Sequence, residues 1–312
     1  MTARHRPPPG PDRGRPRTYA LGGQIVEAAS LAPGLYVVAT PIGNLGDITL
    51  RALETLAAAD LVACEDTRVT RKLIDRYAIA TPLTPYHDHN AEAARPALLA
   101  RLAAGAAVAL VSDAGTPLIS DPGFKLVRAA RAAGCAVTAL PGPSAVMAAL
   151  AGAGLPTDRF FFEGFLPAKA GARAARVAEL EHLPATLVLF ETGPRLADSL
   201  AALAQGLGDR EAAICRELTK LHEEVRRGDL SALAAHYAGE AERRGEFVVV
   251  IAPPPAGAAA PSADALDALL AGALDTSSLK DAVATVAEAT GVPRRDVYQR
   301  ALALAKAREG AR

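Results

Sequence analysis

Short apolar runs alternate with helical segments along the chain, and this alternation constrains the fold more than any other feature. The apolar runs have the length of strands and cover residues 35–39, 61–64, 107–112, 136–140, 159–163, 186–191, 212–215 and 247–252. Segments with the periodicity of amphipathic helices lie between them, at 48–58, 92–104, 124–133, 144–153, 173–182 and 195–207. Strands that alternate with helices of this length favour crossover connections and largely parallel sheets. We therefore predict an α/β fold.

Two composition breaks divide the 312 residues, which exceed the usual size of one domain. A turn with the sequence PGPS separates a first α/β domain, expected at 34–142, from a second, expected at 143–252. Residues 253–263 are rich in Pro and Ala and are typical of a semi-rigid linker. The tail that follows, 264–312, contains only helical patterns.

The tail has the signals of two helices joined by a short turn. Ser278 is the expected N-cap of the first of these helices, with Asp281 as its capping-box partner. Gly291 suits the position after that helix, and Pro293 suits the first turn of the next. We therefore expect a small helical domain.

The N-terminal extension and the overall composition exclude several classes of protein. Residues 1–33 are basic and Pro-rich, lack the apolar core of a secretory signal, and are expected to be disordered through about residue 30. Thirty-four Lys and Arg balance thirty-four Asp and Glu, so contact with nucleic acid would need local basic patches. Three widely spaced cysteines and the lack of a long apolar stretch favour a reducing cytosol and no membrane span.

Gly/Pro-rich or polar clusters follow successive predicted strands. In chain order they are TPIGNLGDIT, CEDTR, YHDHN, SDAGTPLISDPG, PGPS, FETGPR and RELTK. Each one alone is equally consistent with a turn or a surface ion pair, but their recurrence at strand ends indicates a ligand site, because open α/β sheets bind ligands there. The phosphate loop GxxxxGK[ST], the dinucleotide motif GxGxxG, HExxH and CxxC are all missing, so neither a nucleotide hydrolase nor a metal site is supported.

These strings, in this order, resemble the tetrapyrrole methylase superfamily, and within it the members that methylate ribosomal RNA of the small subunit. The resemblance covers about residues 34–252, and the helical tail is also similar. It implies two αβα domains followed by a small C-terminal helical domain, with S-adenosyl-L-methionine bound in a cleft between the first two. It also implies a cytoplasmic homodimer that 2′-O-methylates a cytidine in the decoding region of 16S rRNA within the small ribosomal subunit. FETGPR departs from the family's FES wording, although Thr for Ser keeps the hydroxyl.

The resemblance also assigns site residues. The positions that match the superfamily's cofactor loops are Pro41, Gly43, Asp113, Gly115, Thr116, Leu118, Ser144, Ala145, Phe190, Glu191, Glu217 and Gly245. Gly- and Pro-rich loops suit this cofactor because exposed backbone groups can meet its carboxylate, amine and hydroxyls.

A ribose hydroxyl is a poor nucleophile at neutral pH, so the transfer benefits from a base or a nearby cation. The candidate catalytic residues are Lys220, Glu65, Asp66, His87 and Asp88. We favour Lys220 for polarising the hydroxyl, because a lysine at a strand-end cleft can have a lowered pKa. The choice of base among the other four stays open.

Two other functions compete with RNA methylation. One is C-methylation of a tetrapyrrole or another small molecule, although superfamily members with that activity commonly carry a GDP-type sequence in place of SDAGTP. The other is a non-enzymatic nucleic-acid-binding regulator, suggested by the tail with Arg294, Arg295 and Arg300. From residue 275 onward seven Lys and Arg face five Asp and Glu, which is a weak excess for a stand-alone DNA reader.

Overall fold

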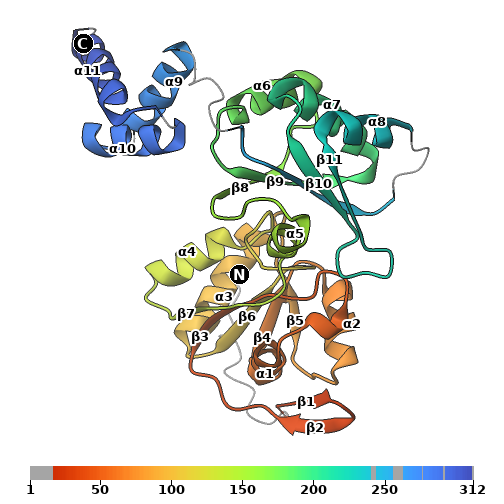
Figure 1. Ribbon diagram of the computed structural model, residues 1–312. Coiled ribbons are helices and arrows are strands. Elements are labelled where there is room, and N and C mark those ends of the chain that lie inside the picture. The colour runs from red at the N-terminus through yellow and green to blue at the C-terminus, as the bar shows by residue number, and fades with distance from the viewer. Residues whose placement is uncertain (1–16, 240–243, 256–262, 276, 291, 311–312) are drawn as a thin grey trace, which may run out of the picture. The chain divides into compact units, whose positions relative to one another are not determined.

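The computed structural model describes residues 17–239, 244–255, 263–275, 277–290 and 292–310 (Figure 1). The chain divides into two compact units, which are described here separately. The first unit runs to Ala148 and includes Leu218–Leu221, and the second contains the rest. The division therefore falls six residues beyond the expected boundary at 142/143, and a short segment near residue 220 groups with the first unit.

A five-stranded parallel sheet forms the centre of the first unit. Its strands lie in the order β5 (Leu83–Pro85), β4 (Leu61–Cys64), β6 (Ala107–Val111), β3 (Gly34–Val38) and β7 (Val137–Leu140). Helices α1 (Leu50–Ala58) and α2 (Thr67–Arg76) cover one face, and α3 (Ala91–Ala103) and α4 (Phe124–Ala132) cover the other. Each face has its own buried core, so the central strands are apolar on both sides, as the sequence predicts.

A hairpin precedes this sheet, and the expectation of disorder through about residue 30 is wrong there. Strands β1 (Thr18–Leu21) and β2 (Gln24–Glu27) pair antiparallel. Tyr19 is buried against the core under α1, and Arg17 donates to Asp60 at 2.6 Å. Residues 1–16 lie outside the described residues. One buried aromatic ring and one ion pair thus order a segment whose composition alone suggests a tail.

The second unit contains a mixed sheet, which corrects the prediction of largely parallel sheets. Its strands lie in the order β11 (Glu224–Asp229), β10 (Glu211–Arg216), β12 (Glu246–Ile251), β9 (Thr186–Thr192) and β8 (Phe160–Phe165). Only β8 and β9 pair in parallel, and the other three pairs are antiparallel. Seven residues join β10 to β11, too few for a crossover helix.

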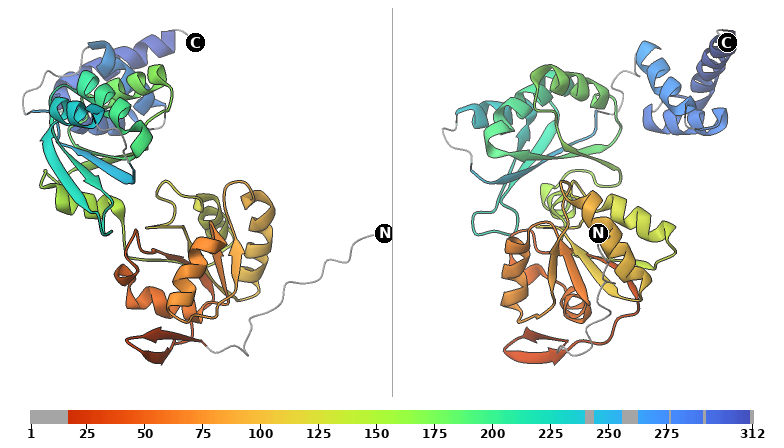
Figure 2. Two further views of the ribbon diagram at one scale, coloured as in Figure 1. Left: turned by 90° about the vertical axis from the view of Figure 1, so that its right-hand side faces the viewer. Right: turned by 180° about the vertical axis from the view of Figure 1, so that it is seen from behind.

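Helices α6 (Ala170–Leu180), α7 (Gly193–Leu207) and α8 (Leu230–Gly239) share one core with a face of this sheet, as the views in Figure 2 show. Helix α5 (Ala145–Ala153) contains the point at which the two units divide. Most predicted helices and strands are confirmed within a few residues. The structure also contains elements that the sequence patterns did not predict: the short strand β5, the polar strand β11 and helices α2 and α8.

Three helices form the tail: α9 (Ala263–Leu274), α10 (Leu279–Thr290) and α11 (Arg294–Gly310). They have a core of their own that includes Leu270, Val283 and Val297. The expected cap is confirmed, since Ser278 Oγ accepts from the Asp281 N–H at 3.2 Å and donates to its carboxylate at 2.6 Å. The predicted Gly291 lies outside the described residues, as does most of the proposed linker, at 256–262. Within the described parts of the chain, no helix has the length and apolar character that crossing a bilayer requires.

Candidate functional site

The first unit has a topological switch point between β3 and β6. These strands are neighbours, yet the chain leaves β3 toward β4 on one side and leaves β6 toward β7 on the other. Loops that diverge from the carboxyl ends of adjacent strands create the crevice in which open α/β sheets bind ligands. The clusters that follow β3, β4, β5, β6 and β7 therefore lie at this edge of the sheet, whereas FETGPR belongs to the second unit.

Backbone hydrogen bonds hold the diverging loops together at their base. Thr40 and Gly115 exchange two N–H···O bonds of 2.9 Å, and the positive φ of Gly115, 75°, suits a residue without Cβ. Thr116 Oγ1 then donates to the Pro143 carbonyl at 3.2 Å. The loops after β3, β6 and β7 are thus linked through hydrogen bonds.

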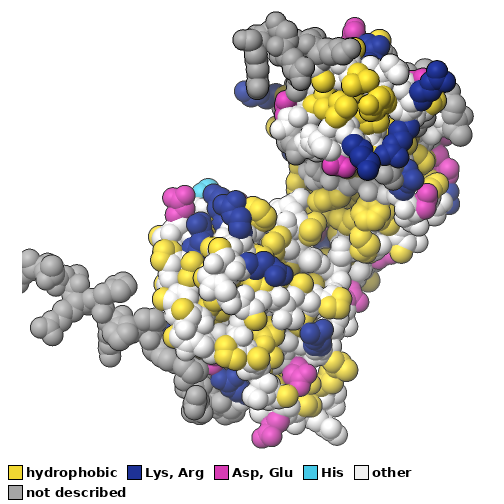
Figure 3. Space-filling model, turned by 90° about the vertical axis from the view of Figure 1, so that its left-hand side faces the viewer, with side chains coloured by type: hydrophobic (Ala, Val, Ile, Leu, Met, Phe, Trp, Pro, Cys, Tyr) yellow, Lys and Arg dark blue, Asp and Glu magenta, His cyan; other side chains and the backbone are white. Residues whose placement is uncertain are grey.

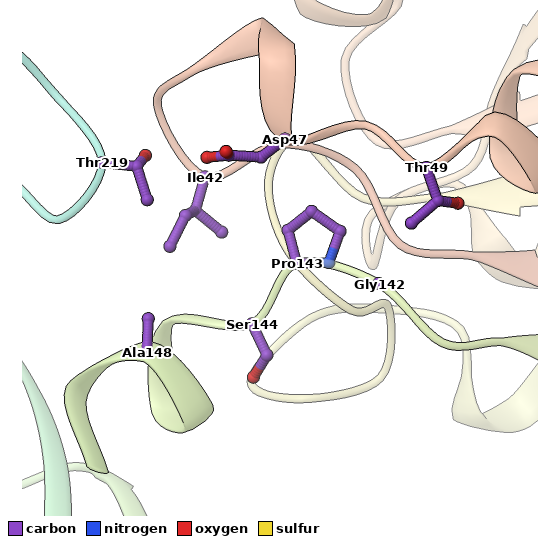
Figure 4. A pocket seen from close by; sticks show the side chains of 8 residues that line it. All are labelled: Ile42, Asp47, Thr49, Gly142, Pro143, Ser144, Ala148 and Thr219. Atoms are coloured by element: carbon purple, nitrogen blue, oxygen red, sulfur yellow. The ribbon is translucent and has the colours of Figure 1, made fainter. Parts of the chain in front are cut away.

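A pocket of 320 Å³ opens above this edge, next to the loops after β3 and β7 (Figure 4). Its lining residues are Ile42, Asp47, Thr49, Gly142, Pro143, Ser144, Ala148 and Thr219. This volume lies at the small end of the range for ligand pockets, about 300–1,000 Å³. The lining combines apolar side chains, three hydroxyls and one carboxylate, which suits a small ligand with both apolar and polar parts.

A tight turn places Asp47 at the pocket. Asn44 caps the short 3₁₀ turn at residues 45–47 by accepting the N–H two residues on, at 3.0 Å. Tyr77 on α2 donates its hydroxyl to the Leu45 carbonyl at 2.7 Å. Thr49 caps α1 by accepting from the Ala52 N–H at 3.1 Å. The cap of α1 is therefore Thr49, and the Asp47 side chain takes no part in capping this helix.

Lys220 crosses the loop after β3. A Cβ built on Gly43 would lie 2.4 Å from Lys220 Cγ and 3.0 Å from Lys220 Cε. Gly43 is therefore required for the lysine to take this path. The loop that carries Lys220 is strained, with φ of 50° at Glu217 and 68° at Thr219, and strain of this kind is concentrated at functional sites.

Carboxylates gather on the β4 side of the same edge. Burial raises the pKa of Glu65, Asp113 and Asp121. Repulsion by a neighbouring carboxylate adds to each shift: Asp113 acts on Glu65 and on Asp121, and Asp66 acts on Asp113. Asp113 Oδ1 accepts from the Asp66 N–H at 2.9 Å, which joins the loops after β4 and β6. The structure thus brings Glu65, Asp66 and Asp113 together, but none of them lines the pocket.

The remaining catalytic candidates have local structural partners. Asp66 caps α2 and pairs with Arg68 at 2.6 Å, which lowers the pKa of Asp66 to about 2. His87 begins a turn in which its N–H donates to Asn90 Oδ1 at 2.9 Å. Asp88 is exposed in that turn and adds to the repulsion that raises the pKa of Glu65.

Of the eight expected cofactor residues in the first unit, only Ser144 lines the pocket. Pro41 is buried directly after the Thr40 bridge, and Leu118, with φ of 76°, packs against the core under α4. Ala145 begins α5 beside the lining residue Ser144.

Four expected cofactor residues belong to the second unit. Glu191 is buried, accepting from Ser199 Oγ at 2.5 Å and from the Thr192 N–H at 2.9 Å. Phe190 packs edge-on against Phe162, with ring centroids 4.9 Å apart.

Glu217 and Gly245, the other two, are in contact with each other. Glu217 Oε1 accepts from the Glu246 N–H at 2.9 Å, and a Cβ on Gly245 would lie 2.9 Å from the Glu217 carboxylate. This pair fixes the start of β12.

Of the eight lining residues only Ser144 was expected as a site residue, and sequence reasoning missed the other seven: Ile42, Asp47, Thr49, Gly142, Pro143, Ala148 and Thr219. Asp47 and Thr49 are both residue types that suit a helix start, so neither carries a local signal of a ligand site. Thr219 is adjacent to Lys220. Ala148 carries no signal in its own sequence context.

Two family models match the chain. The model described as Tetrapyrrole (Corrin/Porphyrin) Methylases matches residues 34–234, and the one described as RsmI C-terminal HTH domain matches residues 259–305. The first match spans the predicted strand-end clusters down to RELTK, and the second covers most of the helical tail.

Curated relatives and solved structures are also similar. A protein of Mesorhizobium japonicum named Ribosomal RNA small subunit methyltransferase I is 53% identical over 285 residues, 91% of this chain and 96% of that protein. One of the same name from Pseudomonas aeruginosa is 47% identical, over 86% of this chain and 96% of its own length. Uroporphyrin-III-C-methyltransferase from Thermus thermophilus shares the fold, with a TM-score of 0.51 and 23% identity over 70% of this chain and 94% of its own.

The buried carboxylates at this edge predict a pH dependence of stability. Because the pKa of Asp121 is raised in the folded state, folding binds protons there, and stability falls as the pH rises from the ordinary carboxyl pKa through the raised one. Asp121→Asn removes this loss, so its melting temperature should exceed that of the wild type at pH 7, and the difference should shrink toward pH 4. Thermal unfolding at both pH values measures this effect.

Asp75→Asn is the control for this prediction, because Asp75 is exposed on α2. It should change the melting temperature little at either pH. A lower melting temperature of Asp121→Asn at pH 7 would mean that the hydrogen bond from Ser112 outweighs burial and repulsion.

Proposed function

Because the chain belongs to the tetrapyrrole methylase family, and within it to the group of ribosomal RNA small subunit methyltransferase I, we propose that it transfers a methyl group from S-adenosyl-L-methionine to a ribose 2′-hydroxyl of a cytidine in the decoding region of 16S rRNA. The relatives that share about half of the sequence over most of the chain are named for ribosomal RNA. The tetrapyrrole enzyme shares only the fold, so C-methylation is not favoured. A purely regulatory role is disfavoured by the methylase match over 34–234.

One observation of the structure carries this proposal. Three segments far apart in the sequence, the TPIGNLGD turn, the PGPS turn and the RELTK loop, line the same pocket. The chemical groups that line the pocket match those of the cofactor. Hydroxyls can hydrogen-bond to its carboxylate and ribose, the carboxylate can pair with its cationic groups, and apolar side chains can pack against its hydrocarbon parts. In this proposal Ser144, Thr219 and the backbone around Ile42 and Pro143 hold the reactive end of S-adenosyl-L-methionine.

Methyl transfer requires the attacking oxygen to approach the methyl carbon in line, so positioning supplies much of the rate. Lys220 lies over Gly43 and next to the lining residue Thr219, where a cation would stabilise the charge that develops on the hydroxyl oxygen. Glu65, Asp66, His87 and Asp88 are the candidate bases suggested by the sequence. They follow β4 and β5 on the acidic side of the edge.

The tail is the proposed contact for RNA. At the start of α11, Arg294, Arg295, Tyr298 and Gln299 are all exposed, and Tyr298 is 43% accessible. Two guanidinium groups suit phosphates, and an exposed tyrosine ring suits stacking on an unpaired base. Arg300, in contrast, is paired with Asp267 at 2.5 and 2.9 Å. On the face shown in Figure 3, Lys and Arg side chains form small groups among apolar and acidic ones, so local contacts of this kind fit better than one large basic field.

The finer partner assignments are also proposals. We expect the protein to act on the small ribosomal subunit in the cytoplasm, where that substrate is found. We also expect a homodimer, supported by the exposed aromatic side chains Phe160 and Phe165 on β8, which a second copy would bury.

Labelled methyl transfer tests the proposed function. Purified small subunits lacking the modification are incubated with the protein and S-adenosyl-L-methionine labelled in the methyl group, and the RNA is digested and analysed by mass spectrometry. The proposal predicts label in one 2′-O-methylcytidine. Label on a base, or transfer to uroporphyrinogen in a parallel reaction instead of RNA, would refute it.

Filling the pocket with a larger side chain should weaken cofactor binding. Ala148 lines the pocket from α5, so Ala148→Phe should lower the affinity for S-adenosyl-L-methionine at least tenfold, measured by isothermal titration. Ala151→Phe is the matched control, because Ala151 is exposed on the same helix and lies outside the lining. Equal affinity of the two variants would place the cofactor elsewhere.

Removing the cation should slow the chemical step. Lys220→Met should lower the single-turnover rate by about two to three orders of magnitude, the scale seen when one stabilising donor is lost. Gly43→Ala should slow it as well, because the new Cβ would displace the lysine. Lys72→Met, on the exposed side of α2, serves as the control. If Lys220→Met instead weakens RNA binding and keeps its rate at saturation, the lysine is a phosphate anchor.

Reversing the charge at the start of α11 should weaken RNA binding. The double variant Arg294→Glu/Arg295→Glu should raise the Kd for small subunits at least tenfold, flatten its salt dependence and leave cofactor affinity unchanged. Arg131→Glu, at an exposed position on α4, controls for the added negative charge. An unchanged Kd and salt slope would leave the tail with a structural role.

A further inference from the structure

Asp47 is a carboxylate without a partner at the reactive edge of the first unit. Of the eight residues that line the pocket, all of them described, Asp47 alone carries an ionisable side chain. Its carboxylate makes no hydrogen bond or ion pair with another described residue, unlike that of Asp66, which pairs with Arg68. Figure 4 shows it extending from its turn toward the side of the pocket where Thr219 lies.

The turn that carries Asp47 is held from three directions. Asn44 caps its start, the Tyr77 hydroxyl binds the Leu45 carbonyl, and Ile48 is buried in the core directly after it. Thr49 already caps α1, so Asp47 is not needed to satisfy the helix N-terminus. Asp47 is exposed to solvent and lines the pocket, so its carboxylate is accessible to a ligand that binds there.

We propose that Asp47 is the general base that takes the proton of the target ribose hydroxyl. This inference rests on the proposed function and replaces the bases suggested by the sequence. As the ribose oxygen bonds to the methyl carbon, the carbon–sulfur bond breaks and its electron pair stays on sulfur. The hydroxyl proton passes to Asp47, so the atoms and charges balance: the sulfonium becomes a neutral thioether and the carboxylate becomes a carboxylic acid.

Location separates Asp47 from the other carboxylates. Glu65, Asp66 and Asp88 follow β4 and β5, and none of them lines the pocket. A general base must come within hydrogen-bonding distance of the proton that it removes, so geometry decides before pKa does. Asp47 and Lys220 then have complementary roles, because one accepts the proton while the other stabilises the oxygen that loses it.

Asp47→Asn tests the assignment, because it keeps the shape of the side chain and removes its basicity. Single-turnover methylation of small subunits should slow by about 10²- to 10⁴-fold, the usual contribution of a general base. The affinities for S-adenosylhomocysteine, by isothermal titration, and for the RNA, by filter binding, should stay within a few-fold of the wild type. The rise of the wild-type rate with pH on the acid side should flatten in the variant. Asp75→Asn, exposed on α2, is the matched control.

The other possible results would overturn the inference, and they can be told apart from one another. A rate and pH profile equal to those of Asp75→Asn would exclude Asp47 as the base. Loss of S-adenosylhomocysteine affinity with the rate retained at saturation would make Asp47 a cofactor ligand for the amino group. If the wild type itself transfers no methyl group to ribosomal RNA, the proposed function fails and the inference falls with it.

Discussion

Two backbone hydrogen bonds between Thr40 and Gly115 join the carboxyl ends of β3 and β6 at the point where the chain turns away from them in opposite directions. Without them the two loops would diverge from the sheet edge independently. With them, the loop after β6 reaches the PGPS turn through Thr116, and the loop after β3 is held where Ile42 and Asp47 line the pocket. The positive φ of Gly115 explains why this position favours glycine.

The edge of this sheet is divided electrostatically. Glu65, Asp113 and Asp121 lie on one side, and burial raises their pKa. The pocket lies beside β3 and β7 and carries a single carboxylate. RNA phosphates would be repelled by the acidic side and attracted by the exposed arginines of α11.

The sequence predicted the parts of the fold that depend on local patterns. The central strands of the first sheet were recognised because both of their faces are apolar, and the Ser278 cap because its spacing to Asp281 is specific. Strand β5 was not predicted because it has only three residues and ends in Pro85 at a sheet edge. Strand β11 was not predicted because half-buried and exposed positions alternate along a mostly charged segment, and such a pattern does not encode the direction of pairing.

Local sequence patterns located the loops of the candidate site but not the side chains that enter its pocket. Strand-end loops could be located from their Gly and Pro residues, which placed Gly43, Gly115 and Ser144 near the edge where the structure has them. Which side chain enters the pocket depends on contacts distant in sequence, such as the hydrogen bond from Tyr77 that fixes the turn of Asp47. No local pattern distinguishes Asp47 from an ordinary capping residue.

The central claim is that the 320 Å³ pocket beside β3 and β7 is the site of methyl transfer. The most direct measurement is a crystal structure of the protein with S-adenosylhomocysteine. If methyl transfer takes place in the pocket, the sulfur atom of this product lies there, in contact with the Ile42 and Pro143 segments and within reach of Asp47. Binding with the sulfur outside the pocket, for example among the acidic loops after β4 and β5, would contradict it.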